Sequence, residues 1–401
     1  MQLTHREKLA ISLSVYSTVK AHFAHWQSLG DFDFEKAFAE FSDEIVDTDD
    51  RRLFSLALLK LLAGLKNSHT DLYDGWLWDT HGQSFGFYAR ELDGQWVVTS
   101  SLLDEIPVGS IVSLIDGIDV AAVAERHMRY IPASSTRAAK THVFFRRYLF
   151  PNTFDVTLDS GTIVKCEKKK RVVNSQPAVS TASIEHRNGV PVLRIPSFED
   201  GGFEESAVQL INECAGAPGI VIDLRGNGGG NTPMDLIAKL MDRPYRMWTD
   251  VTNAVISSIY ATDTAYPNVM QKQDLRALPY LVTPSPQFVP RDDAYAGRLV
   301  VLIDEYCFSA AEDFLLPLSQ GSRATFVGST TAGSTGQPLL QVLAPDLVLR
   351  VGAKRQLFPD GSPFEGSGHS PHVSVSPTVH SVREGRDQSL EVAIDLISST
   401  P

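Results

Sequence analysis

Two short segments of the chain hold a hydroxyl and an imidazole that could act together in nucleophilic catalysis. Ser309 lies in EYCFSAAEDF, after an apolar strand-like run and at the start of a helix-like one. That setting exposes a hydroxyl beside helix N–H groups, as in a nucleophile elbow. His69, in NSHTD, is the candidate general base. Such a base needs a third group to orient it, and Ser68 and Glu365 are the two candidates.

The same residues also have plain structural interpretations. Ser309 would be the N-cap of its helix, with Glu312 completing a capping box. His69 would be an ordinary turn histidine. Spacing alone favours these alternatives, although Ser309 can fill both roles at once.

A glycine-rich segment, DLRGNGGGNTP, spans Asp223 to Pro233 and follows the apolar run GIVI. Glycine in an ordered segment costs roughly 0.5–1 kcal/mol relative to alanine, so the backbone here must serve a purpose. A dinucleotide fingerprint fails because Asn231 replaces its last glycine, and the Gly-Lys-Ser/Thr of a P-loop is missing. Two interpretations are left: a tight turn, or an oxyanion hole, where a side chain would obstruct the reacting oxygen.

Metal and cofactor chemistry have little support in the sequence. His369 and His372 form an H-x-x-H pair, but no third ligand accompanies them. Cys166, Cys214 and Cys307 are odd in number and far apart. We therefore expect no metal, no cofactor and no disulfide framework.

Charge and hydropathy exclude two classes of partner. The chain has 36 basic and 48 acidic residues and a net charge of −12, which disfavours nucleic acid. No apolar run approaches the ~20 residues of a membrane span, and the N-terminal segment lacks the apolar core of a signal peptide. We expect no nucleic acid, no membrane span and a cytoplasmic location; a trimmed export signal would instead make the protein periplasmic or secreted.

The pattern of the chain changes twice along its 401 residues. Residues 1–78, which carry Ser68 and His69, have the apolar spacing of helices, with Asp33 as one helix cap. Residues 84–171 alternate short strands and turns around one helix, as a small separate β-rich module. Residues 180–401 alternate apolar strands with helices, which predicts an α/β fold with a mainly parallel sheet covered on both faces.

Five segments of the C-terminal half together carry a family resemblance. VPVLRIPSF, IVIDLRGNGGG, SAAEDF, RATFVGSTTAG and FEGSGHSP occur in this order, after an upstream LKNSHT. In this combination the chain resembles, over nearly its whole length, the serine peptidase family of the C-terminal-processing (tail-specific) proteases and the tricorn core protease. The resemblance implies a crotonase/ClpP-like core sheet, serine endopeptidase activity on peptides or unfolded protein tails, and no cofactor.

Within that family the resemblance points to the tricorn-like type. Processing proteases with a Ser–Lys dyad carry lysine in T-x-G-K-G, whereas this chain has TTAGSTGQ, with Ser334 or Thr335 in the lysine's place. The tricorn-like type uses a Ser-His-Ser-Glu set instead.

Matched residue by residue, this set assigns four roles. The resemblance implies that Ser309 is the nucleophile and His69 the general base. Ser68 would orient the imidazole, held in turn by Glu365. The oxyanion would accept hydrogen bonds from the N–H groups of Gly229 and Ala310. Gly228, the neighbour of Gly229, is the alternative to it.

The β-rich module resembles a PDZ domain. SFGF, formed by Ser84, Phe85, Gly86 and Phe87, stands where that family has its carboxylate-binding loop. A substrate C-terminus would then bind at the strand edge, and removal of the module would change substrate choice more than the chemistry. A structural module with a filled groove is the alternative. The sequence is also compatible with a homo-oligomer.

Departures from the family pattern leave rival functions open. His372 stands where the family often has aspartate, and Cys307 and Phe308 precede the nucleophile where small or hydroxyl residues are common. One rival is a non-catalytic carrier of apolar ligands on the same fold. Another is a crotonase-like acyl-thioester enzyme, since an oxyanion turn would serve both.

Overall fold

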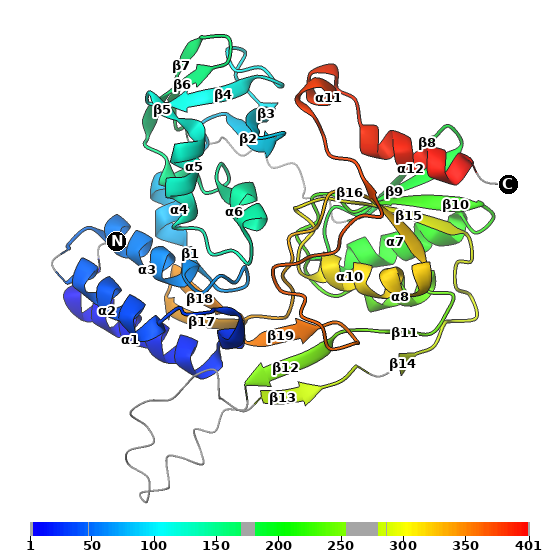
Figure 1. The fold of residues 1–401 in the computed structure, drawn as a ribbon, viewed down its shortest axis with the longest axis horizontal. Coiled ribbons are helices and arrows are strands. Elements are labelled where there is room, and N and C mark those ends of the chain that lie inside the picture. Colours follow the sequence, from blue (N-terminus) through cyan, green and yellow to red (C-terminus); the bar gives the residue numbers. More distant parts are fainter. Residues whose placement is uncertain (1–2, 47, 170–180, 254–279, 286, 400–401) are drawn as a thin grey trace, which may run out of the picture.

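The computed structural model describes residues 3–46, 48–169, 181–253, 280–285 and 287–399. Figure 1 shows a helical N-terminal part in blue, the β-rich module in cyan to green, and an α/β core in green to red. Residues 170–180, between the β-rich module and the α/β core, lie outside the described residues. Across the described ranges, no helix has the length and apolar character needed to cross a membrane.

The N-terminal part is built from helices that begin at polar caps. Its elements are α1 (His5–His22), the 3₁₀ turn η1 (Trp26–Ser28), α2 (Phe34–Ile45), α3 (Arg51–Ala63), β1 (Asp71–Asp74) and α4 (Gly75–His81). The predicted cap Asp33 accepts the Lys36 N–H at 3.0 Å, so that prediction is confirmed. Asp50 and Asp74 cap α3 and α4 in the same way.

The β-rich module is an antiparallel sheet with two helices. Its elements are β2 (Phe87–Leu92), β3 (Gln95–Ser101), β4 (Ile111–Ile115), β5 (Ile118–Asp119), α5 (Val120–Met128), α6 (Thr136–His142), η2 (Arg147–Leu149), β6 (Thr153–Leu158) and β7 (Ile163–Glu167). The strand order is β2-β3-β4-β6-β7, with β5 beside β4. The predicted short strands and turns around one helix are confirmed, with α5 as that helix; the short helix α6 was not predicted.

The N-terminal helices and the module share a single apolar core. Phe54 of α3, Phe85 before β2, and Phe144 after α6 are all buried in one cluster, which also includes Leu349 from the C-terminal half. The module is therefore packed against the N-terminal part rather than isolated from it. The boundaries drawn from the sequence, 1–78, 84–171 and 180–401, stay predictions.

The α/β core has a six-stranded sheet with helices on both faces. Its strands follow the order β20 (Val373–Ser374), β16 (Ala324–Gly328), β15 (Arg298–Ile303), β10 (Gly219–Asp223), β9 (Val190–Arg194) and β8 (Ser183–Arg187), all parallel except β8. One face packs on α7 (Gly201–Glu213), α8 (Met234–Leu240) and α10 (Ala310–Ser319), the other on α12 (Gln388–Ser398). All five residues of β10 are buried, as expected of a sheet covered on both sides. The predicted α/β fold is confirmed.

Strands from the C-terminal half also complete the N-terminal part. β17 (Leu339–Ala344) pairs with β18 (Leu347–Val351), and β18 pairs with β1 so that Asp71 faces Arg350. Further elements of this half are β11 (Tyr245–Arg246), β12 (Thr249–Asn253), β13 (Tyr280–Thr283), β14 (Gln287–Phe288), β19 (Lys354–Leu357), η5 (Gln320–Ser322) and α11 (Val379–Glu384). The β1–β18 pairing holds the loop before β1, which carries His69, against the core.

Candidate active site

Ser309 lies at the junction between β15 and α10 in a strained conformation. Its φ is 56° and its ψ −122°, which a residue with a side chain adopts only when its surroundings impose it. Its hydroxyl makes no cap hydrogen bond to α10, and Glu312 turns instead toward the backbone of Gly333 and Ser334. The capping-box interpretation therefore does not apply, and the hydroxyl is left available for chemistry.

His69 reaches this hydroxyl from the loop between α3 and β1. Its Nε2 lies 3.1 Å from Ser309 Oγ, and its side chain is buried. The loop is held by Thr70, whose hydroxyl donates to Asn67 Oδ1 and accepts the Gly352 N–H. A side chain at Gly352 would approach Asn67 Oδ1 to 2.4 Å, so glycine is needed where β18 passes the loop.

Ser334 links the imidazole to a carboxylate. His69 Nδ1 lies 2.9 Å from Ser334 Oγ, and the Ser334 hydroxyl donates to Glu365 Oε1 at 2.8 Å. Because that hydroxyl has one proton and uses it in the hydrogen bond to Glu365, its oxygen must accept a hydrogen bond from His69 Nδ1. The proton of the neutral imidazole then lies on Nδ1, which leaves Nε2 free to accept the Ser309 proton.

The structure corrects the position expected for Ser68. Its hydroxyl does not contact the imidazole: it accepts the Ser134 N–H at 2.9 Å and reaches Glu365 only through the Ser134 hydroxyl. Neighbouring side chains in the turn point apart, so that His69 enters the core while Ser68 faces the module. Ser334, noted in the sequence only as a replacement for lysine, takes the place between His69 and Glu365.

Burial sets the protonation of the two titratable groups. It lowers the pKa of His69 well below its usual 6.5, with a smaller contribution from the charge of Arg350. It raises the pKa of Glu365 to about 7, against the opposing effect of hydrogen bonds from Ser134, Ser334 and Asn67. Near neutral pH the imidazole is therefore an uncharged base, and Glu365 is close to its titration midpoint.

A second buried carboxylate, Glu312 of α10, shapes the loop that carries Ser334. It accepts the N–H groups of Gly333 and Ser334 at 2.7 and 2.9 Å, and also the Thr331 hydroxyl. Burial raises its pKa to about 8. Glu312 thus fixes the backbone beside the imidazole, whereas the sequence predicted it only as a member of a capping box.

The two histidines of the H-x-x-H pair are each engaged with the backbone. His369 Nε2 lies 3.1 Å from the Glu312 carbonyl, and His372 Nδ1 accepts the Phe326 N–H at 2.9 Å. The part of the chain that the structure describes contains no group of three or more His, Cys, Asp or Glu side chains arranged to hold a metal ion.

The glycine-rich segment lies directly against Ser309. A Cβ at Gly229 would approach the Phe308 carbonyl, Ser309 Cβ and Ala310 N to between 2.6 and 2.9 Å, and the φ of Gly229 is +94°. Its N–H, however, already donates to Asn227 Oδ1 at 2.8 Å. Gly229 thus supplies close approach, while its amide is not available for an oxyanion.

Two other amides are better placed for that purpose. Among the described residues, the N–H groups of Gly228 and Ala310 have no protein acceptor. Gly228 is exposed, and space around it is open. Of the two alternatives drawn from the sequence, the geometry favours Gly228 over Gly229.

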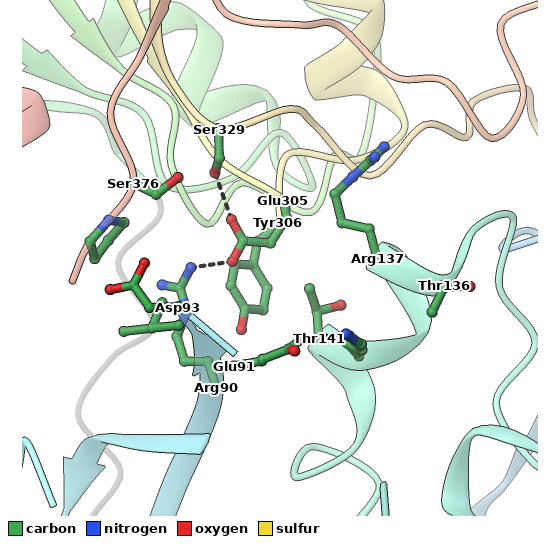
Figure 2. A pocket seen from close by; sticks show the side chains of 13 residues that line it. Arg90, Glu91, Asp93, Thr136, Arg137, Thr141, Glu305, Tyr306, Ser329 and Ser376 are labelled. Atoms are coloured by element: carbon green, nitrogen blue, oxygen red, sulfur yellow. Dashed lines mark hydrogen bonds and ion pairs between the residues drawn. The ribbon is translucent and has the colours of Figure 1, made fainter. Parts of the chain in front are cut away.

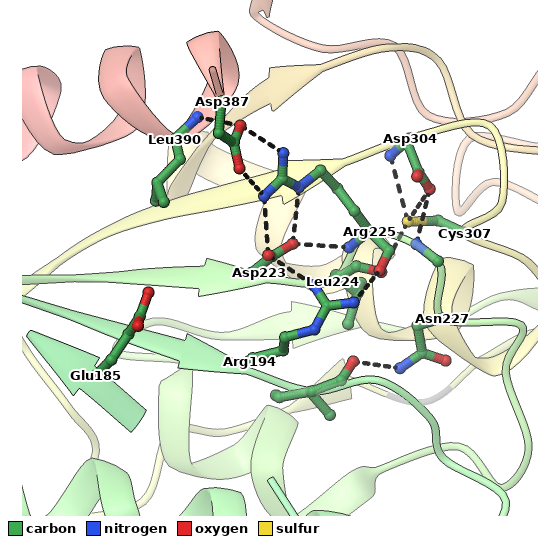
Figure 3. Close-up of polar contacts among 12 residues, drawn as sticks. Glu185, Arg194, Asp223, Leu224, Arg225, Asn227, Asp304, Cys307, Asp387 and Leu390 are labelled. Carbon is green, nitrogen blue, oxygen red and sulfur yellow. Dashed lines mark hydrogen bonds and ion pairs between the residues drawn. The ribbon is translucent and has the colours of Figure 1, made fainter. Parts of the chain in front are cut away.

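Polar contacts behind the segment hold it rigid (Figure 3). Arg225 binds both oxygens of Asp223 at 2.9 Å and both oxygens of Asp387 at 2.7 and 2.8 Å. Asn227 Nδ2 donates to the Ile195 carbonyl, and the Cys307 thiol donates to the Leu224 carbonyl at 3.2 Å. Cys307, a departure from the family pattern, thus ties the loop that carries Ser309 to the end of β10.

A pocket of about 660 Å³ adjoins the site. Gly228 and Phe308 form part of its wall, and Phe308 also stacks on His69 with ring centroids 4.5 Å apart. Apolar side chains from the N-terminal part and the module form much of the remainder: Leu72, Tyr73, Trp78, Pro132, Ala138 and Phe145. Asp71 and Arg146, which also line it, neutralise each other in an ion pair.

The predicted peptide-binding loop is partly occupied by its own contacts. Phe85 is buried in an aromatic cluster, and the Gly86 N–H donates to Ser84 Oγ at 3.2 Å. Phe87 begins β2, the end strand of its sheet. Tyr88 on this strand donates to the Thr141 carbonyl of α6, so α6 lies beside the strand. Capture of a substrate C-terminus here stays a prediction.

Comparisons with known proteins give one family match and several solved structures with a similar fold. Residues 189–375 match the model of peptidase family S41. The structure of mature CPAF complexed with lactacystin superposes with a TM-score of 0.74 at 15% identity, covering 98% of this chain and 99% of that one. A putative peptidase from Parabacteroides merdae gives a TM-score of 0.56 at 14% identity, covering 99% of this chain and 98% of that one. The photosystem II D1 C-terminal processing protease gives a TM-score of 0.50 at 18% identity, covering 94% of each chain. At such identities the likeness concerns the fold. No curated protein matches the chain.

Proposed function

Since the domain matched over residues 189–375 belongs to peptidase family S41 and the protein is a serine peptidase, we propose that it cleaves internal peptide bonds of unfolded chains by acyl-enzyme chemistry. The observation that carries the proposal is the continuous hydrogen-bonded series from Ser309 through His69 and Ser334 to Glu365. It has a nucleophile, a base and two groups that orient the base, as this chemistry requires.

The reaction begins with proton transfer from Ser309 Oγ to His69 Nε2 as the oxygen attacks the peptide carbonyl. The imidazolium that forms donates its Nδ1–H to Ser334 Oγ, and the Ser334 hydroxyl in turn donates a hydrogen bond to the ionised Glu365. His69 then protonates the leaving amine, and a water molecule hydrolyses the acyl-enzyme with the same base. Acid–base catalysis of this kind contributes roughly 10²–10⁴-fold.

The tetrahedral oxyanion is assigned to the N–H groups of Gly228 and Ala310. Both amides lack a protein acceptor within the described residues, and Ala310 begins α10, where the helix dipole favours negative charge. Loss of one such donor costs about 3–4 kcal/mol of transition-state stabilisation.

The substrate is assigned a bulky apolar side chain next to the scissile bond. The pocket beside Phe308 and Gly228 is lined mainly by apolar groups. Of its charged groups, Asp71 pairs with Arg146 and Glu305 with Arg90, and Arg350 also lines it. An aromatic or branched aliphatic side chain gains most from such a wall, because its burial removes apolar surface from water. Binding of the substrate C-terminus by the PDZ-like module, a homo-oligomer and a cytoplasmic location remain predictions from the sequence.

The first test is intact-mass spectrometry after treatment with a fluorophosphonate. We expect one adduct on the wild type and none on Ser309→Ala or His69→Ala, with all three folded by circular dichroism. An adduct that survives in Ser309→Ala would refute the assignment. No adduct on folded wild type, together with a bound apolar ligand, would favour the carrier; a stability shift with coenzyme A would favour the acyl-thioester enzyme.

A further inference from the structure

The β-rich module contributes a residue to the network around Glu365. Ser134 lies between α5 and α6, and its N–H and hydroxyl form a reciprocal pair with Ser68: the N–H of each serine donates to the hydroxyl oxygen of the other at 2.9 Å. Because Ser68 directly precedes His69, this pair joins the module to the loop that carries the base.

The Ser134 hydroxyl also donates to Glu365. Its acceptor is Oε1, the same oxygen that accepts from Ser334 Oγ at 2.8 Å and from Asn67 Nδ2 at 2.6 Å. Asn67 comes from the N-terminal part, Ser134 from the module and Ser334 from the core. All three parts of the chain therefore meet at one carboxylate oxygen.

We propose that Ser134 is a positioning residue for the reaction: it holds Glu365 ionised and turned toward Ser334, so that the module completes the catalytic network. The proposal rests on the proposed function of this site. Three donors on one oxygen stabilise the charged carboxylate and fix its rotation. If the Ser134 donor is lost, Glu365 takes up a proton more readily and Ser334 no longer has a fixed acceptor.

Further contacts hold the segment that carries Ser134 against the core. Arg137 donates to the Thr331 carbonyl through Nε and Nη2, at 3.1 and 2.8 Å, and to the Ser367 carbonyl at 3.0 Å. A side chain at Gly366, next to Glu365, would approach the Ser134 carbonyl to 3.0 Å. The link 134–137 thus packs on both loops that carry Ser334 and Glu365.

A second set of contacts joins the module to the nucleophile loop (Figure 2). Arg90 of β2 pairs with Glu305, which also accepts the Ser329 hydroxyl at 2.7 Å. Tyr88 and Tyr306 share a hydrogen bond of 2.9 Å. Displacement of the module from the core would break these contacts and withdraw Ser134 from Glu365 together.

The charged groups around Glu365 come from several elements. Glu312 of α10 faces the same loop; burial raises its pKa, and the charge of Glu365 adds a smaller contribution. His69 is connected through Ser334, and Arg137 of α6 lies on the loops on either side. None of these groups is altered when the Ser134 hydroxyl is removed. The variant loses the bond to Glu365 and the acceptor of the Ser68 N–H, and it keeps the bond from the Ser134 N–H to Ser68.

The test compares Ser134→Ala with Ser135→Ala in the full chain. Ser135 is the matched control because it caps α6 through the Ala138 N–H at 3.1 Å and makes no bond to Glu365. Carboxyl ¹³C NMR, with Glu365→Gln used to assign the signal, reads the titration of Glu365 directly. The pH dependence of fluorophosphonate labelling reads its effect on Ser309.

We expect Ser134→Ala to raise the Glu365 titration midpoint and to slow labelling at pH 7 about tenfold, as for loss of one hydrogen bond to a charged group. Ser135→Ala should lower thermal stability yet leave both readouts unchanged, and Ser134→Thr should restore them. An unchanged Glu365 titration in folded Ser134→Ala would overturn the proposal. Absence of labelling in wild type would refute the proposed function instead, while the NMR titration still decides the role of Ser134.

Discussion

Ser334 Oγ lies 2.9 Å from His69 Nδ1 although the two residues are 265 positions apart in the chain. The contact depends on two separate supports. Glu312 fixes the backbone of Ser334 from the core side, and the β1–β18 pairing fixes the His69 loop from the other. The orientation of the imidazole is therefore a property of the assembled fold rather than of either segment.

Ser334→Ala and Ser68→Ala should separate the two serines by their effects. Loss of the Ser334 hydroxyl leaves His69 Nδ1 without an acceptor, and we expect kcat to fall by about 10²–10³-fold with little change in KM, because an unoriented base is a poor one. Ser68→Ala removes only a contact to Ser134 and should cost about tenfold or less. Steady-state kinetics on an unstructured peptide checks both. Equal losses would show that Ser68 acts on the imidazole directly.

Activity should rise with pH through about 7, because Glu365 must be ionised to accept the hydrogen bond from the Ser334 hydroxyl. The sign follows from its raised pKa: below that value the carboxyl is protonated in the folded protein, and Ser334 is free to turn its proton toward His69 Nδ1. His69 itself ionises at much lower pH. In a kcat/KM profile from pH 5 to 9, Glu365→Gln should be slower and lack this rise. A rise that persists in Glu365→Gln would assign it to another group.

Gly229→Ala should slow the reaction strongly, whereas Gly228→Ala should fold with wild-type stability. A methyl group at 229 collides with the Phe308 carbonyl and Ser309, and the left-handed φ adds strain. A methyl group at 228 enters open space. We expect fluorophosphonate labelling to slow by at least about 10²-fold in Gly229→Ala, since the nucleophile and the oxyanion donors are displaced together. Labelling of Gly229→Ala at the wild-type rate would contradict this arrangement.

Phe145→Ala should weaken selection for bulky apolar substrates. Phe145 lines the pocket and is 51% exposed, so its loss removes a contact surface with little effect on the core. We expect kcat/KM for an aromatic-containing peptide to fall about tenfold relative to its alanine counterpart. Leu102→Ala is the control, because Leu102 is 82% exposed on the same module and does not line the pocket. Similar changes in both variants would place substrate selection elsewhere.

The sequence predicted which residues belong to the site better than it predicted which of them are hydrogen-bonded to each other. The alternation of apolar strands and helices was enough for the α/β core, and motif order brought Ser309, His69 and Glu365 into one hypothesis. Which serine meets the imidazole depends on the direction of side chains in the Asn67–Thr70 turn, and no periodicity encodes that direction. The replacement of lysine at Ser334 was visible, but its meaning required the loop geometry set by Glu312.

Two further features were beyond sequence reasoning for the same reason. The choice between Gly228 and Gly229 turns on one hydrogen bond from Asn227. The role of Ser134 requires that the module pack on the core, whereas the β-rich pattern predicted a separate unit. The role of a small polar residue in a loop cannot be predicted from its type or spacing, because it depends on which other loops pack beside it.

The pairing of β1 with β18 also determines when, during synthesis of the chain, the site can assemble. During synthesis the segment with His69 leaves the ribosome long before residues 347–351, so β1 has no partner strand, and Ser309, Ser334 and Glu365 do not yet exist beside the base. The network can close only when almost the whole chain has been made. A nascent or prematurely terminated chain therefore lacks the assembled network, whichever of its four residues it already contains.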